Sequence, residues 1–124
     1  MEEKRNAMAF DELTLLRRIK TRPEIFFGKK SLLSLRDFLF GVDYGISAAK
    51  NERYQGSNLP FFTGFVSWYI SRFVRDENGY AAWWNHLLYT SGNDDAYAFD
   101  SFFVYFEQYL KEEHARGLSE ERQE

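Results

Sequence analysis

Two acidic pairs, Asp76-Glu77 and Asp94-Asp95, come nearest in this sequence to an arrangement that could do chemistry. Two carboxyl groups in one site can serve as a general acid and a general base. These pairs, however, flank an expected helix at 80–90, and a helix of that length holds its ends about 15 to 20 Å apart. That distance excludes shared proton chemistry. We expect the acids to form turns and helix caps; the alternative is an acidic surface that attracts a basic partner.

The sequence lacks the other common catalytic and metal-binding patterns. Its two histidines, His86 and His114, fall on different expected helices, and no His-Glu-x-x-His pattern or regular carboxylate spacing supplies three metal ligands. No serine lies in a Gly-x-Ser-x-Gly motif, and there is no glycine-rich phosphate loop. Because there is no cysteine, thiolate nucleophiles, cysteine ligands and disulfides are also excluded. We predict a protein that is not an enzyme and uses no cofactor and no metal.

Aromatic residues make up 19% of the chain, with 13 Phe, 8 Tyr and 3 Trp among 124 residues. A chain of this length forms one domain with one substantial core. Large rings fill a small core efficiently, but Tyr and Trp also suit partner surfaces, because each combines a rigid apolar body with a polar group. We expect both uses of the rings.

Charge and hydropathy limit the class of partner. The 16 Lys and Arg residues against 19 Asp and Glu give a net charge of -3, which argues against nucleic-acid binding over the whole surface. No apolar run approaches the roughly 18 residues of a membrane span, and the first 20 residues contain no apolar signal core. We predict a cytoplasmic protein with neither a nucleic-acid nor a membrane partner. A basic cluster could contact phosphate, but it has no interleaved stacking platform of aromatic residues and is expected to be a solvated face. Its residues are Arg17, Arg18, Lys20, Arg22, Lys29 and Lys30.

Apolar residues recur at helical spacing in five segments, and strand alternation is sustained nowhere. We therefore predict an all-α fold, a single compact domain of about five helices over residues 1–118, followed by a polar C-terminal tail at 119–124. Gly117 is expected to end the last helix, and Asp94 or Asp95 to cap its start. The predicted helices cover residues 8–21, 31–51, 61–75, 80–90 and 95–115.

The helix at 31–51 carries two apolar faces, so we expect it to lie centrally with neighbours on both sides. Ser31 is suited to cap its N-terminus. Gly41 and Gly45 lie four residues apart, where they could let a neighbouring backbone approach closely. The alternative is that they only weaken the helix, by about 1 kcal/mol each. The smaller of the two faces consists of Leu33, Phe40 and Tyr44.

Aromatic and charged residues at the margins of the apolar stripes are candidates for a partner-binding surface. Trp68 lies away from the main stripe of its helix, close to two arginines, which is a composition typical of interface hot spots. A tryptophan packed on a neighbouring helix beneath arginine stems would give the same sequence. Tyrosines of the last helix pose the same choice. The candidate residues are Trp68, Arg72, Arg75, Asp76, Glu77, Trp83, Asp94, Asp95, Tyr105 and Tyr109.

Residues 21–28 form a corner between the first two expected helices. Pro23 fixes its own φ and disfavours a helical conformation at Arg22, so the preceding helix must end there. Gly28 permits a left-handed turn from which the next helix can begin. We interpret Arg22, Pro23 and Gly28 as a structural motif, with Arg22 bonding local carbonyls or a carboxylate.

This corner is followed by a Ser-Leu-x-x-Leu-x-x-Phe-Leu-x-Gly helix, an aromatic helix, a Gly-aromatic helix start, and a Phe-rich helix that opens with acids. In this order of motifs the sequence resembles a group of small bacterial all-helical proteins, some of them immunity proteins of polymorphic-toxin systems. Glu24 and Phe26 depart from the glycine and tyrosine common in that group. The matching residues are Arg22 to Gly28, Ser31, Leu32, Leu35, Phe38, Leu39, Gly41, Phe65, Trp68, Gly79, Tyr80, Trp83, Asp94, Asp95, Ala96, Phe99, Phe102 and Phe103.

The resemblance implies an all-helical protein that neutralises a cognate toxin by occluding it, through aromatic and acidic surface residues rather than catalysis. A small folded inhibitor needs only a rigid face with a few buried anchors. The alternative is a structural or regulatory adaptor, which could be a homodimer joined through Trp68 or the tyrosines of the last helix.

Overall fold

The computed structural model of the protein describes residues 11–55, 58–74 and 83–123. Within these ranges the chain forms helices and no strand, which confirms the predicted all-α domain. One helix, α3, is a single short turn that is not among the predicted helices. The helices are α2 (Glu12–Thr21), α3 (Pro23–Phe27), α4 (Leu32–Ala49), α5 (Pro60–Phe73), α6 (Trp83–Thr90) and α7 (Asp95–Gln123).

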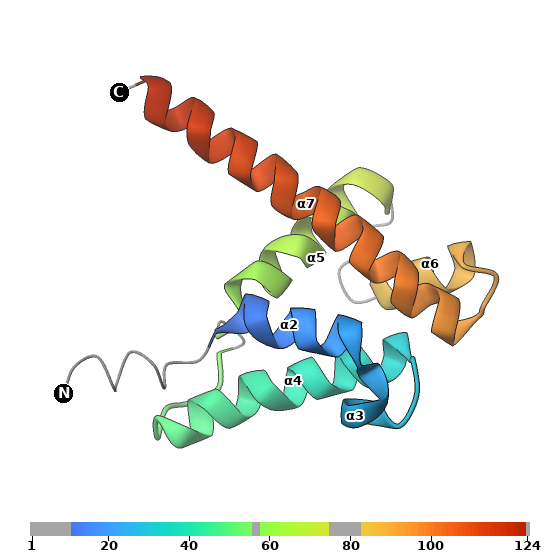
Figure 1. Ribbon diagram of the computed structural model, residues 1–124. Helices are drawn as coiled ribbons and strands as arrows, with labels where there is room; N and C mark the ends of the chain where they lie inside the picture. The colour runs from blue at the N-terminus through green and yellow to red at the C-terminus, as the bar shows by residue number, and fades with distance from the viewer. Residues whose placement is uncertain (1–10, 56–57, 75–82, 124) are drawn as a thin grey trace.

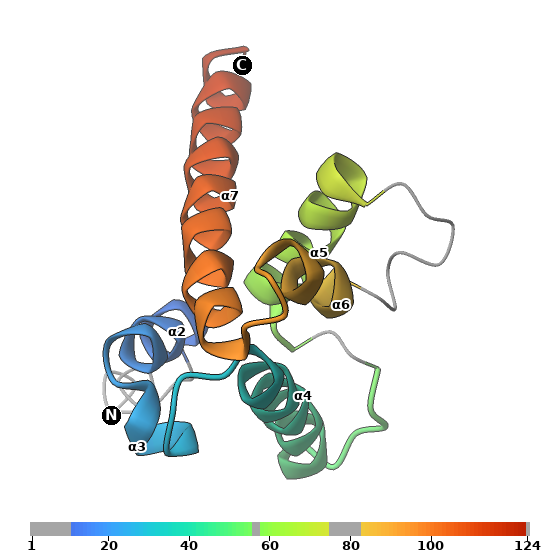
Figure 2. The same cartoon turned by 90° about the vertical axis from the view of Figure 1, so that its right-hand side faces the viewer.

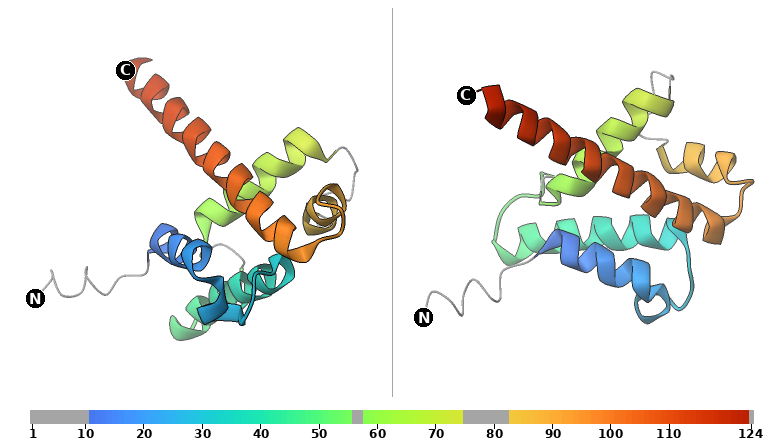
Figure 3. Two further views of the ribbon diagram at one scale, coloured as in Figure 1. Left: turned by 45° about the vertical axis from the view of Figure 1, so that its right-hand side comes forward. Right: turned by 45° about the horizontal axis from the view of Figure 1, so that its top comes forward.

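Two helices, α4 and α7, form the middle of the domain and pack against each other. In Figure 2, α2 and α3 lie on one side of them, and α5 and α6 lie on the other. Figure 1 shows that the C-terminal end of α7 projects away from α2 and α4, and the two views in Figure 3 agree with this arrangement. The prediction that α4 packs on both sides is confirmed only in part: it contacts α6 and α7, and Phe38 packs against Phe26 of α3, but Phe40 and Tyr44 of its second apolar face are exposed.

The core is aromatic where α5 meets α7. The ring of Phe65, which is fully buried, lies edge-on to Phe102 at 4.9 Å and to Phe106 at 5.7 Å between centroids. Such pairs contribute about 0.5 to 1.5 kcal/mol each beyond their burial of apolar area. Aliphatic side chains from α2 and α4 complete the core. These are Leu16, Ile19, Leu32, Leu35 and Leu39.

The corner is built largely as its sequence predicts. Helix α2 ends at Thr21, immediately before the Arg22-Pro23 step, and Gly28 adopts a left-handed φ of 76°. Between them Pro23 begins the one-turn helix α3, because its fixed φ suits the first helical position. Ser31 then caps α4 as predicted, by accepting a hydrogen bond of 3.0 Å from the backbone N–H of Ser34.

The predicted end of the last helix at Gly117 is wrong, because α7 continues to Gln123 and includes most of the expected polar tail. A helix can carry one glycine at a cost of about 1 kcal/mol when the residues around it favour helix. Those residues include Glu113 and Arg116, whose side chains form an ion pair of 2.6 Å one turn apart.

The close helix approach occurs at Gly64 rather than at the two glycines of α4. A Cβ added to Gly41 or Gly45 would meet no atom within 4 Å, so these glycines only weaken their helix. A Cβ on Gly64 would instead overlap the hydroxyl of Tyr109. The absent side chain on α5 therefore leaves room for a ring of α7.

Candidate functional site

Glu12 fixes the start of α5 against α2. Its buried carboxylate, 6% exposed, accepts hydrogen bonds from the backbone N–H groups of Phe61 at 3.0 Å and Phe62 at 2.8 Å. These N–H groups lie in the first turn of α5, where no carbonyl of the helix can accept from them. Burial raises the pKa of the Glu12 carboxyl, although the two backbone hydrogen bonds act in the opposite direction.

The acids at the start of α7 form helix caps, as expected from the sequence. Asp94 caps α7 itself, by accepting from the backbone N–H of Tyr97 at 3.0 Å. Asp95 reaches instead to the start of α4, where it accepts from the Ser31 hydroxyl at 2.5 Å and from the backbone N–H of Leu33 at 3.1 Å. Because Asp95 joins α7 to α4, its role as a partner-binding residue is corrected to a structural one.

A polar network attaches the loop after α4 to that helix. The carboxylate of Asp43, which is buried, accepts from the backbone N–H of Asn58 at 3.0 Å and from the Tyr54 hydroxyl at 3.3 Å. The Asn58 side chain donates to the backbone carbonyl of Asp43 at 3.0 Å and to the hydroxyl of Ser47 at 2.7 Å. These bonds place the ring of Tyr54 beside the exposed face of α4.

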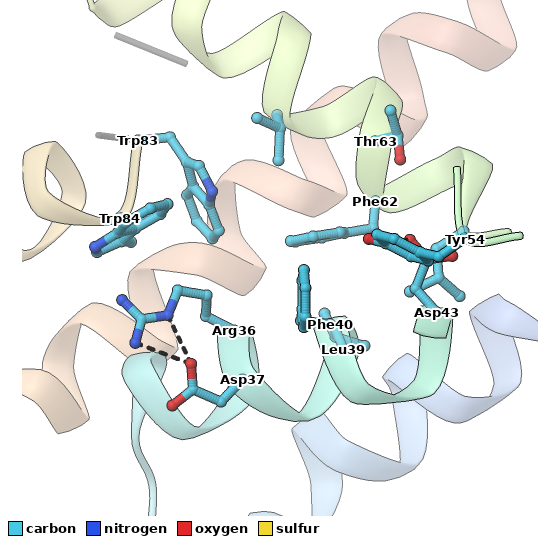
Figure 4. A pocket seen from close by; sticks show the side chains of 12 residues that line it. Arg36, Asp37, Leu39, Phe40, Asp43, Tyr54, Phe62, Thr63, Trp83 and Trp84 are labelled. Atoms are coloured by element: carbon cyan, nitrogen blue, oxygen red, sulfur yellow. Dashed lines mark hydrogen bonds and ion pairs between the residues drawn. The ribbon is translucent and has the colours of Figure 1, made fainter. Parts of the chain in front are cut away.

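The loop, α4, α5 and α6 enclose a hollow of about 680 Å³, which we call the aromatic groove. Figure 4 shows the rings of Phe40, Phe62 and Trp83 pointing into it from three helices. Phe62 and Trp83 meet edge to face at 5.6 Å between centroids. Its lining residues are Arg36, Asp37, Leu39, Phe40, Asp43, Tyr54, Leu59, Phe62, Thr63, Val66, Trp83 and Trp84.

Exposed rings lie at one end of the aromatic groove, on Phe40, which lines it, and on Tyr44, which lies next to it and is not one of its lining residues. Phe40 is 61% exposed and Tyr44 is 57% exposed, although both belong to the central helix. Both rings contact Tyr54, at 5.6 Å and 5.5 Å between centroids. Contiguous exposed rings of this kind mark interaction sites more often than isolated ones do.

At the other end of the groove, Arg36 lies over the ring of Trp84 with 4.8 Å between its Cζ atom and the ring centroid. The same guanidinium forms an ion pair of 2.9 Å with Asp37. The Asp43 carboxylate is already bonded to the loop. Each charged group of the groove thus has a partner within the chain, and what the groove offers a ligand is mainly apolar and aromatic surface.

The surface predicted around Trp68 is occupied by contacts within the chain. The indole N–H donates to Glu112 of α7 at 3.2 Å, and Arg72 forms a two-pronged pair with the same carboxylate at 2.7 and 2.8 Å. The Arg72 guanidinium also covers the indole ring at 4.8 Å. The hydrogen bond from Arg72 is the main cause that lowers the pKa of Glu112. Packing, the alternative given for this tryptophan, is what the structure shows.

Three other aromatic candidates are part of the packed interior. Trp83 is 4% exposed and Tyr109 is 7% exposed, and Tyr105, half-buried, packs against Phe73 at 5.1 Å. The prediction that these three residues form a partner surface is wrong. Neighbouring helices cover a wider part of α6 and α7 than a single apolar stripe. Trp83 still forms part of the floor of the aromatic groove. The candidates Arg75, Asp76 and Glu77 lie outside the described residues.

Phe40, Tyr44 and Tyr54 were not among the predicted site residues. Their signal was present in the second apolar face of α4, to which Phe40 and Tyr44 belong, but that face was assigned to packing. Tyr54 lies in a loop without periodicity, so its position beside α4 depends on the bonds of Asp43 and Asn58.

Comparison of the chain with protein-family models, with curated proteins and with solved structures finds no match. In the part of the chain that the structure describes, no three His, Cys, Asp or Glu side chains come together as a metal site. None of the described helices combines the length and the apolar character needed to cross a membrane.

Proposed function

We propose that this chain is a non-catalytic protein-binding domain that neutralises a toxin by occluding it, and that the aromatic groove is its binding face. The observation that carries the binding proposal is the groove with the exposed ring of Phe40 and the half-buried ring of Tyr54 in its lining, and the exposed ring of Tyr44 beside them. The class of partner rests on the order of motifs that resembles immunity proteins.

A protein segment suits this groove better than a small polar molecule. Small-molecule sites place a few unpaired polar groups around an apolar pocket to orient the ligand. Here the Arg36-Asp37 pair and the Asp43 carboxylate are already bonded. An apolar side chain of a partner would fill the groove, while the exposed rings would surround it as a water-excluding rim.

The test uses the product of the adjacent gene as the candidate toxin. Wild-type protein and the variant Phe40→Ala are each expressed with it, and growth and complex formation are measured. Because Phe40 is 61% exposed, its removal should leave the fold intact while the dissociation constant rises about tenfold or more.

The matched control is Tyr89→Ala, which removes a ring that is 76% exposed and does not line the groove. This variant should bind and protect like wild type. The proposal fails if the candidate toxin forms no complex and growth is not protected. The assignment to the groove fails if a complex forms and the two variants weaken it equally.

A further inference from the structure

A second hollow lies at the corner, between α2 and α3, and has a volume of about 600 Å³. Figure 2 places these helices on the other side of α4 and α7 from α5 and α6, so this hollow is separate from the aromatic groove. Three arginines surround it, and Ile25 and Phe26 supply its apolar part. We call it the arginine hollow; its arginines are Arg17, Arg18 and Arg22.

The three guanidinium groups have no ion pair among the residues the structure describes. Lysines nearby do have one: Lys20 pairs with Glu107 at 3.9 Å, and Lys30 with Asp100 at 3.1 Å. The predicted local bond of Arg22 to a carbonyl or carboxylate is likewise absent among the described residues. Like charges gathered in a concave surface strengthen the local field and favour an anionic ligand.

The apolar part of the hollow distinguishes it from an ordinary solvated basic face. Ile25 is 68% exposed, although it is a large aliphatic side chain. Phe26 is half-buried and packs edge-on to Phe38 at 5.6 Å, so its ring is engaged within the fold. A ligand that fits must therefore combine negative charge with an aliphatic group.

We propose that the arginine hollow binds an acidic segment of a partner protein through carboxylates on Arg18 and Arg22 and an aliphatic side chain on Ile25. Arginine suits this role because its planar fork pairs with a carboxylate through two hydrogen bonds. Single-stranded nucleic acid fits less well, since it requires rings on which bases can stack. This site is independent of the aromatic groove.

The experiment measures fluorescence anisotropy of a labelled glutamate-rich peptide with a central leucine, and of the same peptide with glutamine in place of glutamate. The test variant combines Arg18→Glu with Arg22→Glu. The control variant combines Lys50→Glu with Arg53→Glu, which changes the net charge equally at exposed positions outside the hollow. The acidic peptide should bind wild type, and the test variant should lose about tenfold in affinity.

Three further results are expected. The control variant and Phe40→Ala keep the wild-type affinity for the acidic peptide. Ile25→Ser lowers that affinity about fivefold. The glutamine peptide binds wild-type protein more weakly than the acidic peptide does. Equal losses in the test and control variants would show attraction by overall charge and overturn the proposal. Tighter binding of a single-stranded oligonucleotide than of the acidic peptide at the same ionic strength would also overturn it. Neither result would bear on the proposed binding at the aromatic groove, because that proposal is tested separately with Phe40→Ala.

Discussion

The carboxylate of Glu12 connects α2 to the first turn of α5 through two hydrogen bonds, and its removal gives a sharp prediction. Glu12→Ala leaves the backbone N–H groups of Phe61 and Phe62 without their acceptor. Loss of a helix cap costs about 1 to 2 kcal/mol, and partly buried donors left unpaired add to this. Relief of the buried charge opposes the loss. We therefore expect the free energy of unfolding at neutral pH to fall by about 2 kcal/mol.

The dependence of this loss on pH supplies a second test. Burial raises the pKa of Glu12 above its ordinary value of 4.5, so its carboxyl ionises less readily in the folded chain than in the unfolded one. The stability it contributes is therefore largest below that value and declines as pH rises through the folded pKa. The difference between wild type and Glu12→Ala should be larger near about pH 4 than near about pH 7.

The neighbouring Asp11 is the matched control, because it caps its own helix from an exposed position. Its hydrogen bonds to Thr14 lower the pKa of its carboxyl, so its contribution is present at neutral pH and lost as pH falls. Urea unfolding followed by circular dichroism should show opposite pH trends for Asp11→Ala and Glu12→Ala. The same trend in both variants, or a neutral effect of Glu12→Ala, would refute the reasoning.

Three more predictions concern contacts of α5. Gly64→Ala should destabilise the fold by about 1 to 2 kcal/mol in thermal unfolding, because the new methyl displaces Tyr109, and Tyr109→Phe should recover most of the loss. Burial raises the pKa of Tyr69 to about 12, so stability should decline between about pH 10 and pH 12, and Tyr69→Phe should flatten that decline. Arg72→Ala and Glu112→Ala should each be destabilising but not additive, with a coupling that shrinks in added salt; additive losses would contradict their pairing.

Local sequence signals were sufficient for most of the fold. Ser31 and Asp94 cap the helices that follow them directly, and the Arg22-Pro23 step ends α2, because each acts on backbone within a few residues. The wrong prediction that the last helix ends at Gly117 also has a local cause, since a glycine can lie within a helix when its neighbours favour helix.

The candidate site depends on contacts between residues far apart in the chain. Such contacts cannot be predicted from the spacing of residues in a single sequence. Glu12 and Asp95 cap helices about fifty or more positions away, and Glu112 holds Trp68 across 44 positions. Sequence periodicity identifies an apolar face but not whether a neighbour covers it. The arc containing Tyr109 is covered, whereas the face containing Phe40 is exposed.

The most direct test of the central claim observes the indole N–H signals of isotope-labelled tryptophan while the candidate toxin is added. Trp84 lines the aromatic groove, and Trp68 is held by Glu112 at the α5–α7 contact. We predict that the Trp84 signal shifts or broadens while the Trp68 signal stays in place. A complex in which Trp68 responds and Trp84 does not would contradict binding at the aromatic groove.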